Sequence, residues 1–182
     1  MDNPRERFVE KLDSVQQNVL RMGTLVEESI RKAMKALVDK DVELAQRVIS
    51  EDEPINQLEI DIQDECVAVI ATEQPVASDL RSVITSIKIT TQIERMGDHS
   101  RHIARTAVEL SDQTYMKKLI DIPRMGEIIA NMLHEVLTAY INSDPEKAKE
   151  AAAMDDQIDT LHDQVLREVI TYMMQDPHNI NQ

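Results

Sequence analysis

Residues 8–37, FVEKLDSVQQNVLRMGTLVEESIRKAMKAL, carry the clearest structural signal in the chain. Apolar side chains recur there at alternating spacings of three and four, with charged residues between them. The apolar positions are Phe8, Leu12, Val15, Val19, Met22, Val26, Ile30, Ala33 and Leu37. This pattern predicts a long helix that ends near Asp39 and presents a narrow apolar seam to a partner helix.

The composition excludes the other fold classes. The 182 residues include only three glycines and four aromatic residues, too few to supply the turns and strands of a β-sandwich or barrel. No GxGxxG or GxxxxGK[ST] motif occurs, which argues against a doubly wound α/β fold. We therefore expect an all-α protein. With 20 Lys and Arg against 34 Asp and Glu, the formal charge of −14 makes nucleic acid an improbable partner.

Three features of the sequence indicate the compartment. No apolar run approaches the ~20 residues of a transmembrane helix, so we expect no transmembrane segment. The N-terminal residues lack the apolar segment of a signal peptide. The single cysteine, Cys66, cannot form an internal disulfide, which fits a reducing compartment. These features predict a cytoplasmic protein. Cys66 also falls on an apolar stripe, which predicts a buried, inert thiol.

The remaining sequence predicts further helices. A second helix follows Asp41 and ends at Gln74, with a kink or local break at Pro54. A third ends at Leu110 and carries two apolar stripes, as a helix with two neighbours does. The last expected segments are a fourth helix around 125–140, a fifth from Asp144 to about Gln175, and a sixth beginning at Asp176-Pro177.

A repeat links the two halves of the chain. A shift of 103 residues aligns seven identities, among them Asp41 with Asp144, Asp52 with Asp155 and Leu58 with Leu161, which suggests a duplication. We therefore predict a first three-helix bundle over residues 1–112. A second, incomplete bundle is expected over 113–182, with two helices and the start of a third.

Two carboxylates on the third helix indicate a cation site. Glu94 and Asp98 project within about 20° of the apolar residue Ile87, so they continue a seam. Two like charges four residues apart repel each other, and carboxylates that converge from facing helices can hold a cation. The further candidate ligands are Asp52, Asn56 and Glu59 on the second helix, Asp155 and Asp159 in the second repeat, and His102. On spacing alone, a solvated surface explains the same pairs.

Three segments resemble the PhoU family of phosphate-transport accessory proteins. They are QPVASDLR at 74–81, IERMGDH at 93–99 and the Asp52-x-x-Ile55-Asn56-x-Leu58-Glu59 pattern, within a resemblance that spans about 8–175. The resemblance implies tandem three-helix bundles and metal clusters, often iron or zinc, held by E/DxxxD motifs. It also implies a cytoplasmic, usually dimeric protein at the inner membrane face, with no enzyme activity. Such proteins repress the phosphate-starvation response and act between the phosphate ABC transporter and a sensor histidine kinase.

The resemblance assigns metal ligands residue by residue. Glu94 and Asp98 match the motif of the third helix, Asp52 and Asn56 its counterpart on the second, and Asp155 with Asp159 that counterpart in the second repeat. The second ERxxDH segment would fall after residue 182, which leaves the second site at most half of its ligands. His102 stands where many relatives have Asn.

The sequence thus predicts a non-enzymatic, metal-binding regulator of phosphate uptake and signalling. One alternative is a carboxylate-bridged metalloenzyme, which is disfavoured because no paired Glu-x-x-His motif occurs. The other is a purely structural helical adaptor whose acidic pairs are surface residues. Metal analysis of the purified protein separates the adaptor from the metal-binding regulator.

Overall fold

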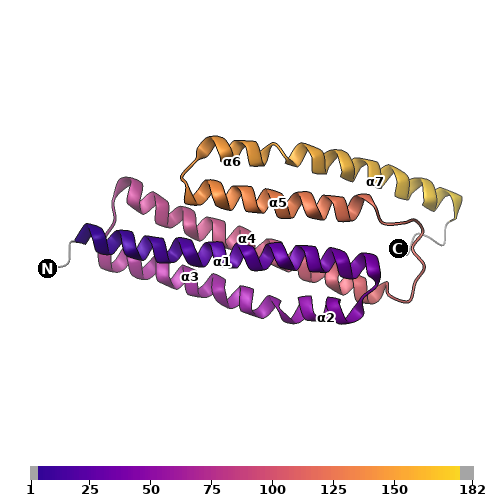
Figure 1. The fold of residues 1–182 in the computed structure, drawn as a ribbon, viewed down its shortest axis with the longest axis horizontal. Coiled ribbons are helices and arrows are strands. Elements are labelled where there is room, and N and C mark those ends of the chain that lie inside the picture. The colour runs from indigo at the N-terminus through magenta and orange to yellow at the C-terminus, as the bar shows by residue number, and fades with distance from the viewer. Residues whose placement is uncertain (1–3, 177–182) are drawn as a thin grey trace.

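The computed structural model describes residues 4–176, which contain seven helices lying roughly side by side (Figure 1). These are α1 (Pro4–Asp39), α2 (Val42–Ser50), α3 (Asp52–Glu73), α4 (Ala77–Glu109), α5 (Asp121–Ile141), α6 (Pro145–Ala152) and α7 (Asp155–Gln175). The all-α prediction is confirmed. The predicted sixth helix falls on residues 177–182, outside the described residues.

The predicted seam of α1 is the centre of the core. Val15, Val19, Met22 and Val26 are fully buried. The residues packed around this seam come from α3 and α4 and include Ile55, Ile62, Cys66, Val69, Val83 and Ile93. Each buried aliphatic side chain contributes about 1.5–3 kcal/mol, so the seam accounts for much of the stability of this bundle. The prediction that Cys66 is buried is also confirmed.

The helices break at two positions that the shift of 103 residues aligns, before Asp52 and before Asp155. The predicted local break lies at Glu51, between α2 and α3, and Pro54 occupies the first turn of α3, where its missing N–H costs nothing. The expectation of one continuous helix from Asp144 to Gln175 was wrong, because α6 ends at Ala152 and α7 begins at Asp155. The amides of Met154 and Gln157 each bond to the carbonyl three residues earlier, and this tight turn breaks the helix without a proline.

The caps of α2 and α6 lie at positions that the shift of 103 residues aligns. The side chain of Asp41 accepts a hydrogen bond from the amide of Leu44, and Asp144 accepts from the amides of Glu146 and Lys147. Both aspartates therefore cap a short helix that precedes the break. The predicted boundary after residue 112 lies in the loop between α4 and α5. The division into two domains stays a prediction.

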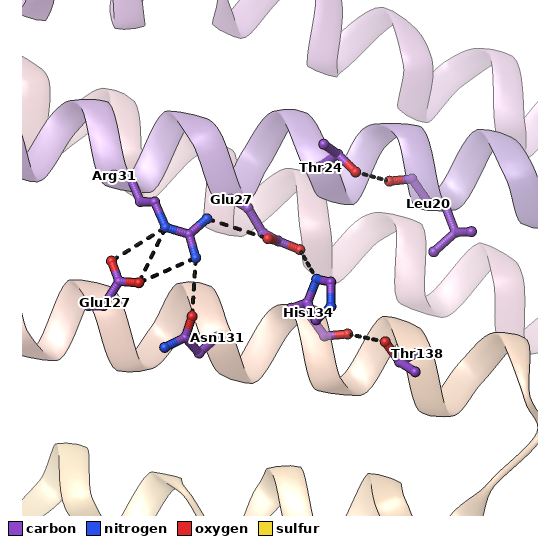
Figure 2. A network of polar contacts seen from close by, with 8 residues as sticks. All are labelled: Leu20, Thr24, Glu27, Arg31, Glu127, Asn131, His134 and Thr138. Carbon is purple, nitrogen blue, oxygen red and sulfur yellow. Dashed lines mark hydrogen bonds and ion pairs between the residues drawn. The ribbon is translucent and has the colours of Figure 1, made fainter.

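The second half docks onto the first through α5. Ala130, Leu133 and Leu137 of α5 are buried in the same core cluster as the seam of α1. A polar network borders this contact, in which Arg31 reaches Glu127 and Asn131, and Oε1 of Glu27 lies 3.3 Å from Nδ1 of His134 (Figure 2). The apolar face of α5 is therefore covered in part by α1.

Apolar surface remains open on the part of the chain that the structure describes. An apolar groove of about 320 Å³ runs between α4 and α5, and Met96, Ile129 and Met132 contribute to its lining. On α7, Leu166, Ile170 and Met174 are 50%, 48% and 81% exposed. Within residues 4–176, no helix combines the length and the apolar character needed to cross a membrane.

Candidate functional site

The packing of α3 against α4 brings two rows of polar side chains together. Asp52, Asn56 and Glu59 lie at helical spacing on α3, so they share one face of that helix. Glu94 and Asp98 do the same on α4. The two helices pack against each other, and the charges of Asp52 and Glu59 on α3 act on the carboxyl of Glu94 on α4. The structure therefore places together the five ligands predicted for the first repeat.

An arginine joins the two rows. Nε of Arg101 on α4 lies 3.2 Å from Oδ2 of Asp52 on α3, and Nη2 of Arg101 donates a hydrogen bond of 2.5 Å to Oδ1 of Asp98. The amide of Asn56 also donates to Oδ2 of Asp52, at 3.3 Å. Only 4% of Asp52 is exposed, so its charge is compensated from within the protein.

Two acceptors in this cluster have no hydrogen-bond partner within the described part of the chain. They are Oδ1 of Asp52 and Oδ1 of Asn56, and both are buried. Nε of Arg101 is a buried donor that also has no hydrogen-bond partner there, so its contact with Asp52 is an ion pair and not a hydrogen bond. Buried polar atoms are nearly always hydrogen-bonded, and an exception of this kind needs an explanation. The cluster has spare oxygen ligands for a further cation or donor.

The pKa of Glu94 is raised by its surroundings in this cluster. Burial raises the pKa of its carboxyl above the usual value, and the neighbouring charges of Asp98, Glu59 and Asp52 raise it further. Arg101 acts in the opposite direction and lowers this pKa. The neighbouring negative charges therefore disfavour the ionised form of Glu94.

As arranged, these side chains do not fit a bound metal ion. Among residues 4–176, no group of three or more His, Cys, Asp or Glu side chains is placed to hold one. The reason is visible in the cluster itself: the guanidinium of Arg101 already engages the carboxylates of Asp52 and Asp98. The carboxylate and amide oxygens have the right chemistry for a hard cation, but the guanidinium of Arg101 already pairs with one carboxylate oxygen of Asp52 and one of Asp98.

The other predicted ligands lie apart from this cluster. His102 is exposed and lines a shallow groove with Leu37 and His99. Asp155 and Asp159 are exposed on α7, where no described helix covers them as α4 covers Asp52. The sequence analysis missed Arg101, although its position three residues after Asp98 places it on the same helix face.

Comparison with known proteins places this architecture in a family. The model of the PhoU domain matches residues 19–107 and 122–182. The chain belongs to the PhoU family. This confirms the resemblance seen in the sequence.

Curated PhoU relatives match over most of their length. The "Phosphate-specific transport system accessory protein PhoU homolog" of Aquifex aeolicus is 38% identical over 174 residues, which cover 96% of this chain and 79% of the relative. The PhoU protein of Escherichia coli is 36% identical over 174 residues, covering 96% of this chain and 72% of the relative. These names describe accessory proteins, and they confirm the prediction of a non-enzymatic protein.

Solved PhoU structures share the fold. The crystal structure of PhoU from Pseudomonas aeruginosa gives a TM-score of 0.91 at 37% identity and covers 96% of this chain and 84% of that one. The "phosphate transport system regulatory protein PhoU" of Streptococcus pneumoniae gives 0.86 at 33% identity and covers 93% and 80%. The arrangement of α1 to α7 is therefore similar to that of experimentally determined PhoU proteins.

Proposed function

We propose that this PhoU family member regulates phosphate transport and represses the phosphate-starvation response while phosphate is plentiful. The observation that carries the proposal is the match to PhoU of P. aeruginosa, with 37% identity and a TM-score of 0.91 over 96% of the chain. The QPVASDLR and IERMGDH segments, which carry the resemblance in the sequence, lie within the region that the PhoU domain model matches. The similarity therefore includes these segments as well as the fold.

The protein acts by contact with other proteins. Its partners are the phosphate ABC transporter and the sensor histidine kinase, which it meets as a homodimer at the cytoplasmic face of the inner membrane. The exposed apolar side chains of α7 and the groove between α4 and α5 support such a role, since large exposed apolar surfaces typically serve as interfaces.

The test is binding of the full chain to the purified kinase and transporter of the same organism, followed by chemical crosslinking in a membrane preparation. Crosslinks to either partner support the proposal, and the absence of crosslinks to both contradicts it. Two exposed apolar residues offer a matched pair for mapping the contact: Leu166→Glu on α7 and Val67→Glu on α3. A loss confined to one of them identifies the contacting face.

The proposal also includes metal binding. The ligands in the first repeat are Asp52, Asn56, Glu59, Glu94 and Asp98, with Asp155 and Asp159 at the equivalent positions of the second. Iron and zinc are the metals that the family resemblance favours. Replacing both Glu94 and Asp98 by Ala removes a like-charge pair and introduces a better helix former, so helicity should persist while metal is lost. Elemental analysis and circular dichroism test this, and metal retained by the double variant would place the ligands elsewhere.

A further inference from the structure

We infer that a cavity between the two halves of the protein binds a small, uncharged apolar molecule about the size of benzene. The cavity has a volume of about 190 Å³ and lies at the end of the molecule where α1 and α4 end and the loop to α5 begins (Figure 1). It shares no lining residue with the cluster of Asp52 and Glu94, and its ligand is separate from the function proposed above.

Segments that are distant in the sequence enclose this cavity. Aliphatic side chains make up most of its wall and come from α1, α4, the loop, α5 and α7. They include Leu37, Leu110, Leu119, Ile122, Val165 and Val169. Because α7 supplies part of the wall, the complete cavity exists only while α7 is docked beside the ends of α1 and α4.

The loop that lines the cavity is attached to both halves. The hydroxyl of Tyr115 donates a hydrogen bond of 2.6 Å to the carbonyl of Leu37 at the end of α1. The ammonium group of Lys40 lies 4.6 Å from the centre of the Tyr115 ring. In the same loop, Lys117 forms an ion pair with Glu168 of α7. The loop therefore ties α1 to α7 beside the cavity.

The polar side chains of the lining already have partners. Thr106 donates to a backbone carbonyl one turn earlier on α4, and Nζ of Lys117 lies 3.9 Å from Oδ2 of Asp121 as well as pairing with α7. The hydroxyl of Tyr115 is bound to α1. Since an unpaired hydroxyl or charge is costly to bury, this lining favours an uncharged, apolar ligand.

The volume of the cavity sets the size of the ligand. An engineered cavity of about 150 Å³ with an apolar lining stays dry and binds benzene. The cavity here is slightly larger and has room for one ring. A helix, about 10 Å across, does not fit, and a water molecule needs two to four polar partners. A small molecule is therefore the occupant that suits this space.

The ligand should hold α7 in place. Leu161 is the one side chain of α7 that is fully buried among Asp155–Gln175. A ligand that binds only the docked arrangement opposes the opening of α7 by mass action. Opening of this helix should therefore be the motion that responds to the ligand.

The direct test measures benzene binding to the full chain and to Val169→Phe by isothermal titration calorimetry. We expect a Kd below about 1 mM for the unchanged protein, which six non-hydrogen atoms can supply. In Val169→Phe the new ring fills the cavity, so binding should weaken about tenfold or more. Ile170→Phe is the matched control, since it places the same ring on the next residue of α7, which is 48% exposed and outside the lining. It should bind as the unchanged protein does.

Two further measurements test the class of ligand and its effect. Phenol should bind about tenfold more weakly than benzene, because its hydroxyl is buried without a partner. At ten times its Kd, benzene should slow hydrogen exchange of the α7 amides about tenfold and change that of residues 15–26 little. If Val169→Phe does not fold, Val165→Leu fills part of the same space with one added methylene group and should also weaken binding.

Three outcomes overturn the inference. Absence of binding to the unchanged protein in benzene-saturated buffer would show that the cavity takes no such ligand. Unchanged affinity of the cavity-filling variant, or unchanged exchange of α7 on binding, would place the ligand elsewhere. Phenol that binds as tightly as benzene would contradict the apolar class. The regulatory role is decided independently by gene expression.

Discussion

The side chain of Leu137 on α5 fills the space that the missing side chain of Gly23 leaves on α1. A Cβ atom at Gly23 would overlap Cδ1 of Leu137, whose side chain is buried with only 3% exposed. The absence of a side chain at Gly23 thus lets α5 approach α1 closely.

Gly23→Ala should therefore destabilise the protein despite the better helix propensity of alanine. Overpacking of a filled core costs about 1–3 kcal/mol, whereas Gly to Ala within a helix gains about 0.5–1 kcal/mol. In a Leu137→Ala background the overlap is absent, so the same substitution should become stabilising. Urea unfolding of the four proteins measures this reversal of sign. The same effect of Gly23→Ala in both backgrounds would show that the helices do not depend on this close approach.

Cys66 should be unreactive in the folded protein. Burial, with a smaller effect of the neighbouring Glu65, raises the pKa of its thiol to about 11. At pH 8 almost no thiolate forms, and the side chain is inaccessible. We expect negligible labelling by a thiol reagent in buffer and complete labelling in denaturant. Rapid labelling of the native protein would mean that the bundle opens at this position.

Glu73 should make the protein sensitive to acid. Hydrogen bonds from Lys11 and then Arg7 lower the pKa of its carboxyl to about 2. A lowered folded-state pKa contributes stability above the ordinary value of about 4.5, and this contribution is lost as the pH falls towards 2. Glu73→Gln should flatten the dependence of stability on pH in that window. Glu10→Gln, an exposed control on α1, should leave the dependence unchanged.

The helix α7 should exchange its amide hydrogens faster than α1. Within the described residues, the main packing partner of α7 is α5, and the side chains of Leu166, Ile170 and Met174 remain exposed. Few buried apolar contacts correspond to low local stability. Hydrogen exchange on the full chain, analysed at a concentration where it is monomeric, measures this. Equal protection of α7 and of residues 15–26 in a monomer would contradict the expectation.

Local signals in the sequence predicted the helices and their starts. The spacing of apolar residues identified the seam of α1, and aspartates at 41 and 144 identified the two caps, because both effects act within a few residues. The acidic faces of α3 and α4 were predicted in the same way. The break at 153–154 was missed because its tight turns contain no proline or glycine to mark them.

Contacts between distant segments could not be predicted in this way. An apolar stripe on α5 shows that the helix has a neighbour but does not show that the neighbour is α1. The room that Gly23 leaves for Leu137 appears only once the two helices are placed together. The role of Arg101 was missed for a related reason. Its pairing with Asp98 follows from helical spacing, but its pairing with Asp52 depends on how α3 and α4 are aligned.

The central claim is that this PhoU family member represses the phosphate-starvation response, and one measurement tests it most directly. The gene is deleted in its native host, and transcripts of phosphate-starvation genes are measured during growth in plentiful phosphate. We predict that these transcripts rise and that the full chain, supplied from a plasmid, returns them to the original level. Transcript levels that stay unchanged after deletion would contradict the claim.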